Sequence, residues 1–158
     1  MQPELHYASV VFRNHQERFT AVVDALPDEG LNWRPGQEMN AVGQLVRHIV
    51  AYQRIFFSFA LGEPAVRSEE EIRTMHVHSF RDEPATRAEL ADLLTQEYAR
   101  VAAELARLDT MNLSDLVPTL RGTERERRRF VTQAMLHAQE HMGHAEITRQ
   151  LWEQRQGT

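Results

Sequence analysis

Apolar residues recur every three or four positions in four stretches of the chain, which is the period of an amphipathic helix. The first stretch runs from about Glu4 to Leu26 and ends before Pro27. The second follows Asn40, a candidate N-cap, and ends at Gly62. Alternating apolar and polar runs between turn residues, which indicate strands, are sparse. The pattern therefore predicts helices and little sheet.

The starts of the third and fourth helices are marked by capping boxes. A T-x-x-E pattern occurs at residues 86–89 and again at 123–126. The helices that follow should end near Asp109 and Arg155. We expect an all-α fold, an antiparallel four-helix bundle that forms a single domain over residues 1–158.

The connections between the expected helices are unusually long for a bundle. They span residues 27–39, 62–84 and 109–122, whereas bundle turns commonly take only a few residues. Long connections indicate folded loops near a functional rim of the bundle.

Composition narrows the chemistry that such a bundle could carry. The chain has no cysteine, so disulfides, thiolate metal sites and a protein-borne thiol nucleophile are excluded. A formal net charge of -5 disfavours a broad contact with nucleic acid, and we interpret the arginines at 125–129 as a solvated helix face. No apolar run is long enough for a membrane helix, and no signal peptide is apparent. We expect a cytoplasmic protein that binds neither nucleic acid nor membrane.

Three histidines lie on the apolar faces of the predicted helices. His137 and His141 are four residues apart, so both rings project from one face of the fourth helix. This spacing alone is weak evidence, because the chain's 8 histidines would give about 0.4 such pairs by chance. On a helical projection, however, both lie mid-stripe on the core-facing side. His48 occupies the same kind of position in the second helix, between Leu45 and Tyr52.

Burying a polar ring costs about 1 to 3 kcal/mol unless it is hydrogen-bonded, so three inward imidazoles need an explanation. One divalent metal ion held by all three would provide it, with Zn or Ni favoured and Fe or Mn as alternatives. The competing interpretation is that each histidine is bonded separately to a carbonyl group or a water molecule. His144 is expected beside this site rather than in it, and His76 and His78 are expected in a surface loop.

These residues resemble a known family, the DinB/YfiT-like four-helix-bundle proteins of the DinB superfamily, over essentially the whole chain. The resemblance depends on L-N-W-R-P at 31–35, on Gly43 with His48, and on H-A-Q-E-H-M-G at 137–143. It implies a divalent ion held by His48, His137 and His141, and homodimers formed through the helices. The family usually has Gln where this chain has His144.

The resemblance also implies several functions, and whether the protein is an enzyme stays open. The first is a metal-dependent thiol S-transferase that joins a low-molecular-weight thiol, such as bacillithiol or mycothiol, to an electrophile. In this transferase, Tyr52, one turn from His48, is a candidate hydrogen-bond partner of a bound group. An alternative is a hydrolase that uses metal-activated water, with Glu97 as a candidate base. The other is a non-enzymatic stress-response bundle in which the ion is a structural clasp, as a fourth ligand at His144 would favour.

Overall fold

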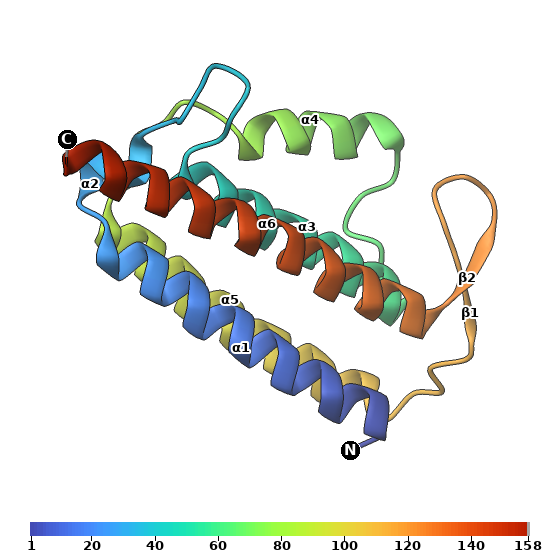
Figure 1. The fold of residues 1–158 in the computed structure, drawn as a ribbon. Coiled ribbons are helices and arrows are strands. Elements are labelled where there is room, and N and C mark those ends of the chain that lie inside the picture. The colour runs from blue at the N-terminus through green and yellow to red at the C-terminus, as the bar shows by residue number, and fades with distance from the viewer. Residues whose placement is uncertain (158) are drawn as a thin grey trace.

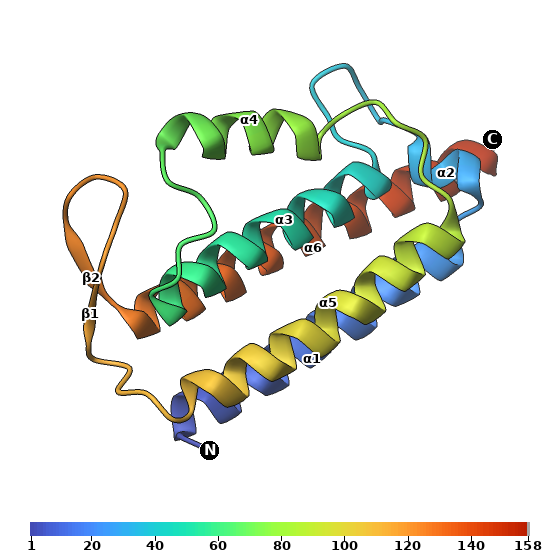
Figure 2. The same ribbon diagram turned by 180° about the vertical axis from the view of Figure 1, so that it is seen from behind.

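The computed structural model describes residues 1–157, in which four long helices form two layers (Figure 1). Helices α1 (Pro3–Ala25) and α5 (Arg87–Leu108) lie side by side in one layer. Helices α3 (Val42–Leu61) and α6 (Arg127–Gln156) form the other. Within each layer the two helices run in opposite directions (Figures 1 and 2). The prediction of an all-α bundle is confirmed.

The long connections contain structure of their own. Helix α2 (Asp28–Asn32) lies at one end of the bundle, and an antiparallel hairpin of β1 (Leu116–Pro118) and β2 (Glu124–Glu126) extends from the other. Helix α4 (Glu69–Ser79) lies over the α3 and α6 layer, on the side away from α1 and α5 (Figure 2). The α3 and α6 layer is therefore covered on both faces.

The core lies between the two layers, where the predicted apolar stripes meet. Phe57 and Leu90 are 0% exposed, as expected for side chains at the centre of a bundle. Removing most of such a side chain costs about 2 to 5 kcal/mol, because the cavity does not fully close. No helix within residues 1–157 is both long and apolar enough to cross a membrane.

The predicted helix starts were only partly correct. Thr86 caps α5 as predicted, and its hydroxyl accepts the backbone N–H of Glu89 at 3.2 Å. Asn40 does not cap α3, because the helix begins two residues later. The N–H of Ala41 instead donates to the Gln44 side-chain oxygen at 3.0 Å.

The capping box predicted at residues 123–126 is wrong, because residues 124–126 form strand β2. The first N–H groups of α6 already have partners in the loop before the hairpin. Arg127 N–H donates to the Asp115 carbonyl and Arg128 N–H to the Leu113 carbonyl, both at 3.1 Å. These two bonds satisfy N–H groups at the start of α6, as a capping side chain does in other helices. A turn at Gly122, with φ of 69°, closes the hairpin.

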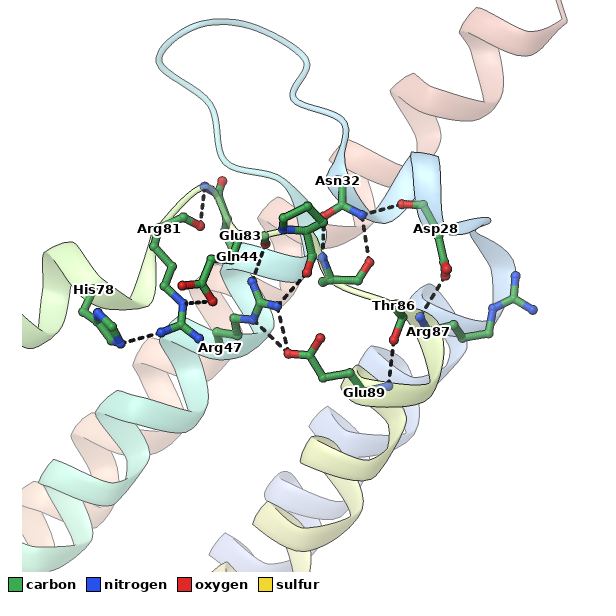
Figure 3. A network of polar contacts seen from close by, with 12 residues as sticks. Asp28, Asn32, Gln44, Arg47, His78, Arg81, Glu83, Thr86, Arg87 and Glu89 are labelled. Atoms are coloured by element: carbon green, nitrogen blue, oxygen red, sulfur yellow. Dashed lines mark hydrogen bonds and ion pairs between the residues drawn. The ribbon is translucent and has the colours of Figure 1, made fainter.

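A polar network fastens the loop that follows α4 to the bundle (Figure 3). The Asn32 side chain exchanges two hydrogen bonds with the Ala85 backbone, at 2.8 and 2.7 Å. Gly43 allows this approach, since a Cβ there would lie 2.7 Å from the Ala85 Cβ. The Gln44 amide donates to the Phe80 carbonyl at 2.7 Å. Asn32 and Gly43, which belong to the motifs of the family resemblance, thus hold the loop at Ala85, and Gln44 holds it at Phe80, directly after α4.

Candidate metal centre

The three predicted histidines converge between α3 and α6, on the face that α4 covers. His48 is 2% exposed, and His137 and His141 are partly buried. Nε2 of His137 lies 3.2 Å from Nε2 of His48 and 3.2 Å from Nε2 of His141. The ligand atoms of all three residues lie within 4.8 Å of one another. The structure therefore brings together imidazoles that are 89 residues apart in sequence.

This arrangement fits a divalent metal ion. Nitrogen ligands about 2.0 to 2.1 Å from a tetrahedral ion are about 3.3 Å apart, close to the two measured separations. Within residues 1–157 this cluster contains only imidazole ligands. Neutral nitrogen ligands suit Zn, Ni and neighbouring ions, and a set of three leaves coordination positions open. The three histidines are positioned to bind one ion.

Ser79, the last residue of α4, fixes the tautomer of His48. The single hydroxyl hydrogen of Ser79 is donated to the His76 carbonyl at 2.7 Å. Its oxygen must therefore accept from His48 Nδ1–H, which lies 3.0 Å away. A proton on Nδ1 leaves a lone pair on Nε2, which is the nitrogen that faces the other histidines. The ring is also stacked on Phe80 at a centroid distance of 4.1 Å.

Burial keeps the cluster uncharged. Burial, followed by the neighbouring rings of His141, His137 and His76, lowers the pKa of His48 to about 3. Burial, followed by His137 and His144, lowers the pKa of His141 to about 4. Burial also lowers the pKa of His137. All three rings are therefore neutral at neutral pH, as a ligand to a metal requires.

Comparison with known families identifies the chain. A family model described as the DinB superfamily matches residues 12–145. The chain belongs to the DinB superfamily. A comparison with curated proteins found no match. Membership confirms the family expected from the sequence motifs.

Solved structures show the same fold at low sequence identity. This DinB protein matches a conserved protein from Enterococcus faecalis with a TM-score of 0.64 and 21% identity, over 92% of this chain and 95% of that one. It matches a mycothiol-dependent maleylpyruvate isomerase with a TM-score of 0.64 and 14% identity. A mutant of such an isomerase gives a TM-score of 0.65 and 15% identity. Both matches cover 87% of this chain and 59% of the isomerase chain, so the DinB chain spans little more than half of that protein.

Two further sequence candidates lie outside the histidine cluster of this DinB protein. Nδ1 of His144 is 3.4 Å from Nδ1 of His141, the nitrogen that points away from the cluster. His144 therefore lies beside the site, as expected. Glu97 is 4% exposed and lies in an ion-pair group between α3 and α5, where it accepts from Arg100 at 2.9 Å and Arg54 at 3.4 Å. Glu97 is therefore paired with arginines and does not belong to the histidine cluster.

The contribution of α4 to the site was missed in the sequence. His76 was expected in a surface loop, but it lies in α4 and its Nδ1 is 3.1 Å from the Tyr52 hydroxyl. The His76 ring also contacts the edge of His48, at a centroid distance of 5.2 Å. A usable signal was present at Ser68, whose hydroxyl accepts the N–H of Glu71 at 3.1 Å and caps α4. The S-x-x-E pattern at 68–71 is the same start signal that identified α5.

Proposed function

We propose that this DinB superfamily protein holds one divalent metal ion through His48, His137 and His141 and transfers a low-molecular-weight thiol to an electrophile. The observation that carries the proposal is the convergence of three neutral imidazole nitrogens beside open space. Zn or Ni is the favoured ion, with Fe or Mn as alternatives, because imidazole suits all of them.

Two further facts support a thiol as the nucleophile. The chain contains no cysteine, so a sulfur nucleophile would have to enter as a small molecule. Mycothiol-dependent isomerases also share the fold, at 14% and 15% identity. When bound, a divalent ion would supply the positive charge that favours loss of a thiol proton at neutral pH.

The residues around the histidines orient the imidazole rings and pack against them. Ser79 and Phe80, at the C-terminal end of α4, orient the His48 ring. Tyr52 is stacked on His137 at a centroid distance of 4.8 Å. Burial raises the pKa of Tyr52, so its hydroxyl keeps its proton at neutral pH and can donate a hydrogen bond.

The alternatives receive less support from this arrangement. A hydrolase needs a general base near the attacked carbonyl, and the candidate Glu97 is ion-paired elsewhere. A structural clasp would be favoured by a fourth protein ligand, but His144 contacts the outer nitrogen of His141. An open set of three ligands is typical of catalytic rather than structural sites.

The proposal is tested by offering the metal-loaded protein a panel of thiols, including bacillithiol, mycothiol and glutathione, with a generic electrophile. We expect metal-dependent consumption of one thiol, lost in His141→Ala. The matched control is His144→Ala, which removes an imidazole one turn away but outside the cluster, and it should keep most of the activity. Consumption that is unaffected by removal of the metal, or background rates with every thiol, would contradict the proposal.

A further inference from the structure

A cavity of about 540 Å³ adjoins the histidine cluster, between α3, α4, α6 and the hairpin. His48, His137 and His141 do not line it, but Tyr52 and His76 do and also contact the histidines, so one end of the cavity lies next to the cluster. Much of the remaining wall is apolar and includes Ile55, Phe56 and Phe130. The volume and the apolar lining are typical of a site for a small organic ligand.

The lining of this cavity is strongly basic. Four arginines line it against one carboxylate, that of Glu69: Arg73, Arg121, Arg125 and Arg129. Two of the four are ion-paired, Arg121 with Glu69 at 2.7 Å and Arg73 with Glu70 at 2.9 Å. Within residues 1–157, the structure gives Arg125 and Arg129 no carboxylate partner. Two guanidinium groups at the hairpin end therefore have no ion-pair partner within the described residues, although Arg125 donates to the Glu124 carbonyl at 2.8 Å.

The pairing of the hairpin explains why its positive charge faces the cavity. Arg125 is directly opposite Val117, so the two side chains share one face of the hairpin. Val117 is buried at 3% exposed, which identifies that face as the inner one. Glu124 and Glu126 point to the opposite face. The E-R-E sequence thus places Arg125 on the face of the hairpin that carries Val117, and the two carboxylates on the other face.

Helix α6 sets the distance between the basic end and the histidines. Arg129, Gln133 and His137 follow one another at intervals of four residues and share a face of the helix. Eight residues of helix separate Arg129 from His137, which corresponds to about 12 Å along the axis. A ligand that contacts both ends must be an elongated molecule of similar length.

We propose that this cavity binds the carboxylate end of an elongated organic anion, whose apolar body lies against Phe56 and Phe130 and whose other end reaches the three histidines. The carboxylate could belong to the thiol or to the electrophile, since both have to reach the histidines. The part of this inference that places the reactive end at the histidines rests on the proposed function. The anion site rests on Arg125 and Arg129 alone.

A second depression borders the same two arginines on the outer side of the hairpin. Glu124, Glu126 and Arg128 also line it. Two carboxylates make that depression a poor site for an anion, so the cavity is the expected location. Arg128, which is ion-paired with Glu126 at 3.1 Å, provides a matched control because it lines only the outer depression.

The test is calorimetric binding of matched probes to metal-free and metal-loaded protein. Mercaptooctanoate and mercaptooctanol represent a thiol with and without a carboxylate. Maleimidohexanoate and N-hexylmaleimide represent an electrophile with and without one, and neither can alkylate a thiol of this cysteine-free chain. The member of each pair that carries the carboxylate should bind more tightly if its class is the natural source of the anion.

Substitutions compare Arg125 and Arg129 with the control residue, Arg128. Arg125→Gln and Arg129→Gln should each weaken binding of the preferred carboxylate by about tenfold, the effect of losing a charge-assisted hydrogen bond. Neither should affect the uncharged probe, and Arg128→Gln should leave both affinities unchanged. The difference between charged and uncharged probes should shrink at high salt.

The outcomes distinguish this inference from the proposed function. Equal affinity for charged and uncharged probes in both pairs, or carboxylate binding that is indifferent to Arg125 and Arg129, overturns the anion site even if thiol transfer occurs. Arginine-dependent carboxylate binding that persists in metal-free protein supports the site even if no thiol is consumed.

Discussion

Buried histidines occur in two regions of this molecule, and their ring nitrogens have different partners. His15 of α1 is 3% exposed and its Nε2 lies 2.9 Å from the Gln139 side-chain oxygen. Because that oxygen can only accept, Nε2 carries the proton and has no lone pair to offer a metal. His48 is equally buried, but its proton is held on Nδ1 by Ser79 and its Nε2 faces two other imidazoles.

The comparison shows that burial does not by itself make a histidine a ligand. One turn of α6 serves both regions, since His137 and His141 face α4 whereas Gln139, between them in sequence, reaches His15 on α1. The ordinary fate of a buried imidazole is a hydrogen bond to an amide or a carbonyl group. What distinguishes the cluster is that three Nε2 atoms converge with the tautomer of His48 already set.

The largest effect should come from removing the central ligand. His137 lies 3.2 Å from both other histidines, so His137→Ala should lose most of the bound metal, whereas wild-type protein should hold about one ion per chain. The control is His15→Ala, which removes a similarly buried ring but should leave metal content unchanged. Elemental analysis of untagged protein measures both, and equal metal contents in the two variants would remove the distinction between the regions.

The convergence of the three histidines could be predicted in part, because helical periodicity groups the residues of one helix face. His48, His137 and His141 were expected to face the core, but in the structure they lie on the side of the α3 and α6 layer that α4 covers. The sequence contained no α4 stripe that would have indicated this second packed face. Periodicity does not indicate what the second ring nitrogen of a histidine contacts. The bond between Ser79 and His48 Nδ1, which sets the tautomer, could therefore not be predicted.

The hairpin and α4 were not predicted from the sequence, and the physical reason is different. Residues 124–126 are all charged and exposed, so their strand comes from backbone pairing rather than from an apolar alternation. The start of α6 is completed by the Asp115 and Leu113 carbonyls, which are remote enough in sequence to leave no local signal. Helix α4 buries only Ser79 fully and therefore lacks the stripe that identified the long helices.

Removing the other buried histidine should affect folding instead of metal binding. His15→Ala should lower the unfolding free energy of the metal-free protein by about 2 kcal/mol, because it leaves a cavity and removes the bond to Gln139. Urea unfolding followed by circular dichroism measures the change. A drop in metal affinity larger than the drop in stability would mean that His15 belongs to the metal centre after all.

The bond that sets the tautomer should contribute less than a ligand does. Ser79→Ala should weaken metal affinity by about tenfold, the lower end of the effect expected when a ligand's supporting hydrogen bond is lost. Ser58 provides the control, because its hydroxyl makes the same type of bond, to the Ile55 carbonyl at 2.7 Å, with no histidine nearby. Competition with a chelator gives both affinities. If Ser58→Ala weakens binding as much as Ser79→Ala, the tautomer argument is wrong.

The smallest effect is a change in stability with pH. It tests burial, the property that the histidines of the two regions share. Burial lowers the pKa of His15 below the usual 6.5, so this ring is neutral in the folded protein while the unfolded chain becomes protonated as the pH falls. The unfolded state then binds more protons, and the unfolding free energy of metal-free protein must decrease as the pH falls below about 6.5. His48 and His141, with pKa values lowered to about 3 and about 4, add to this decrease in the same direction. His15→Ala removes one contributor, so its stability should fall less steeply than that of wild type in a urea series between about pH 7 and pH 5. Identical slopes would mean that His15 has the same pKa in the folded and the unfolded chain, which its burial opposes.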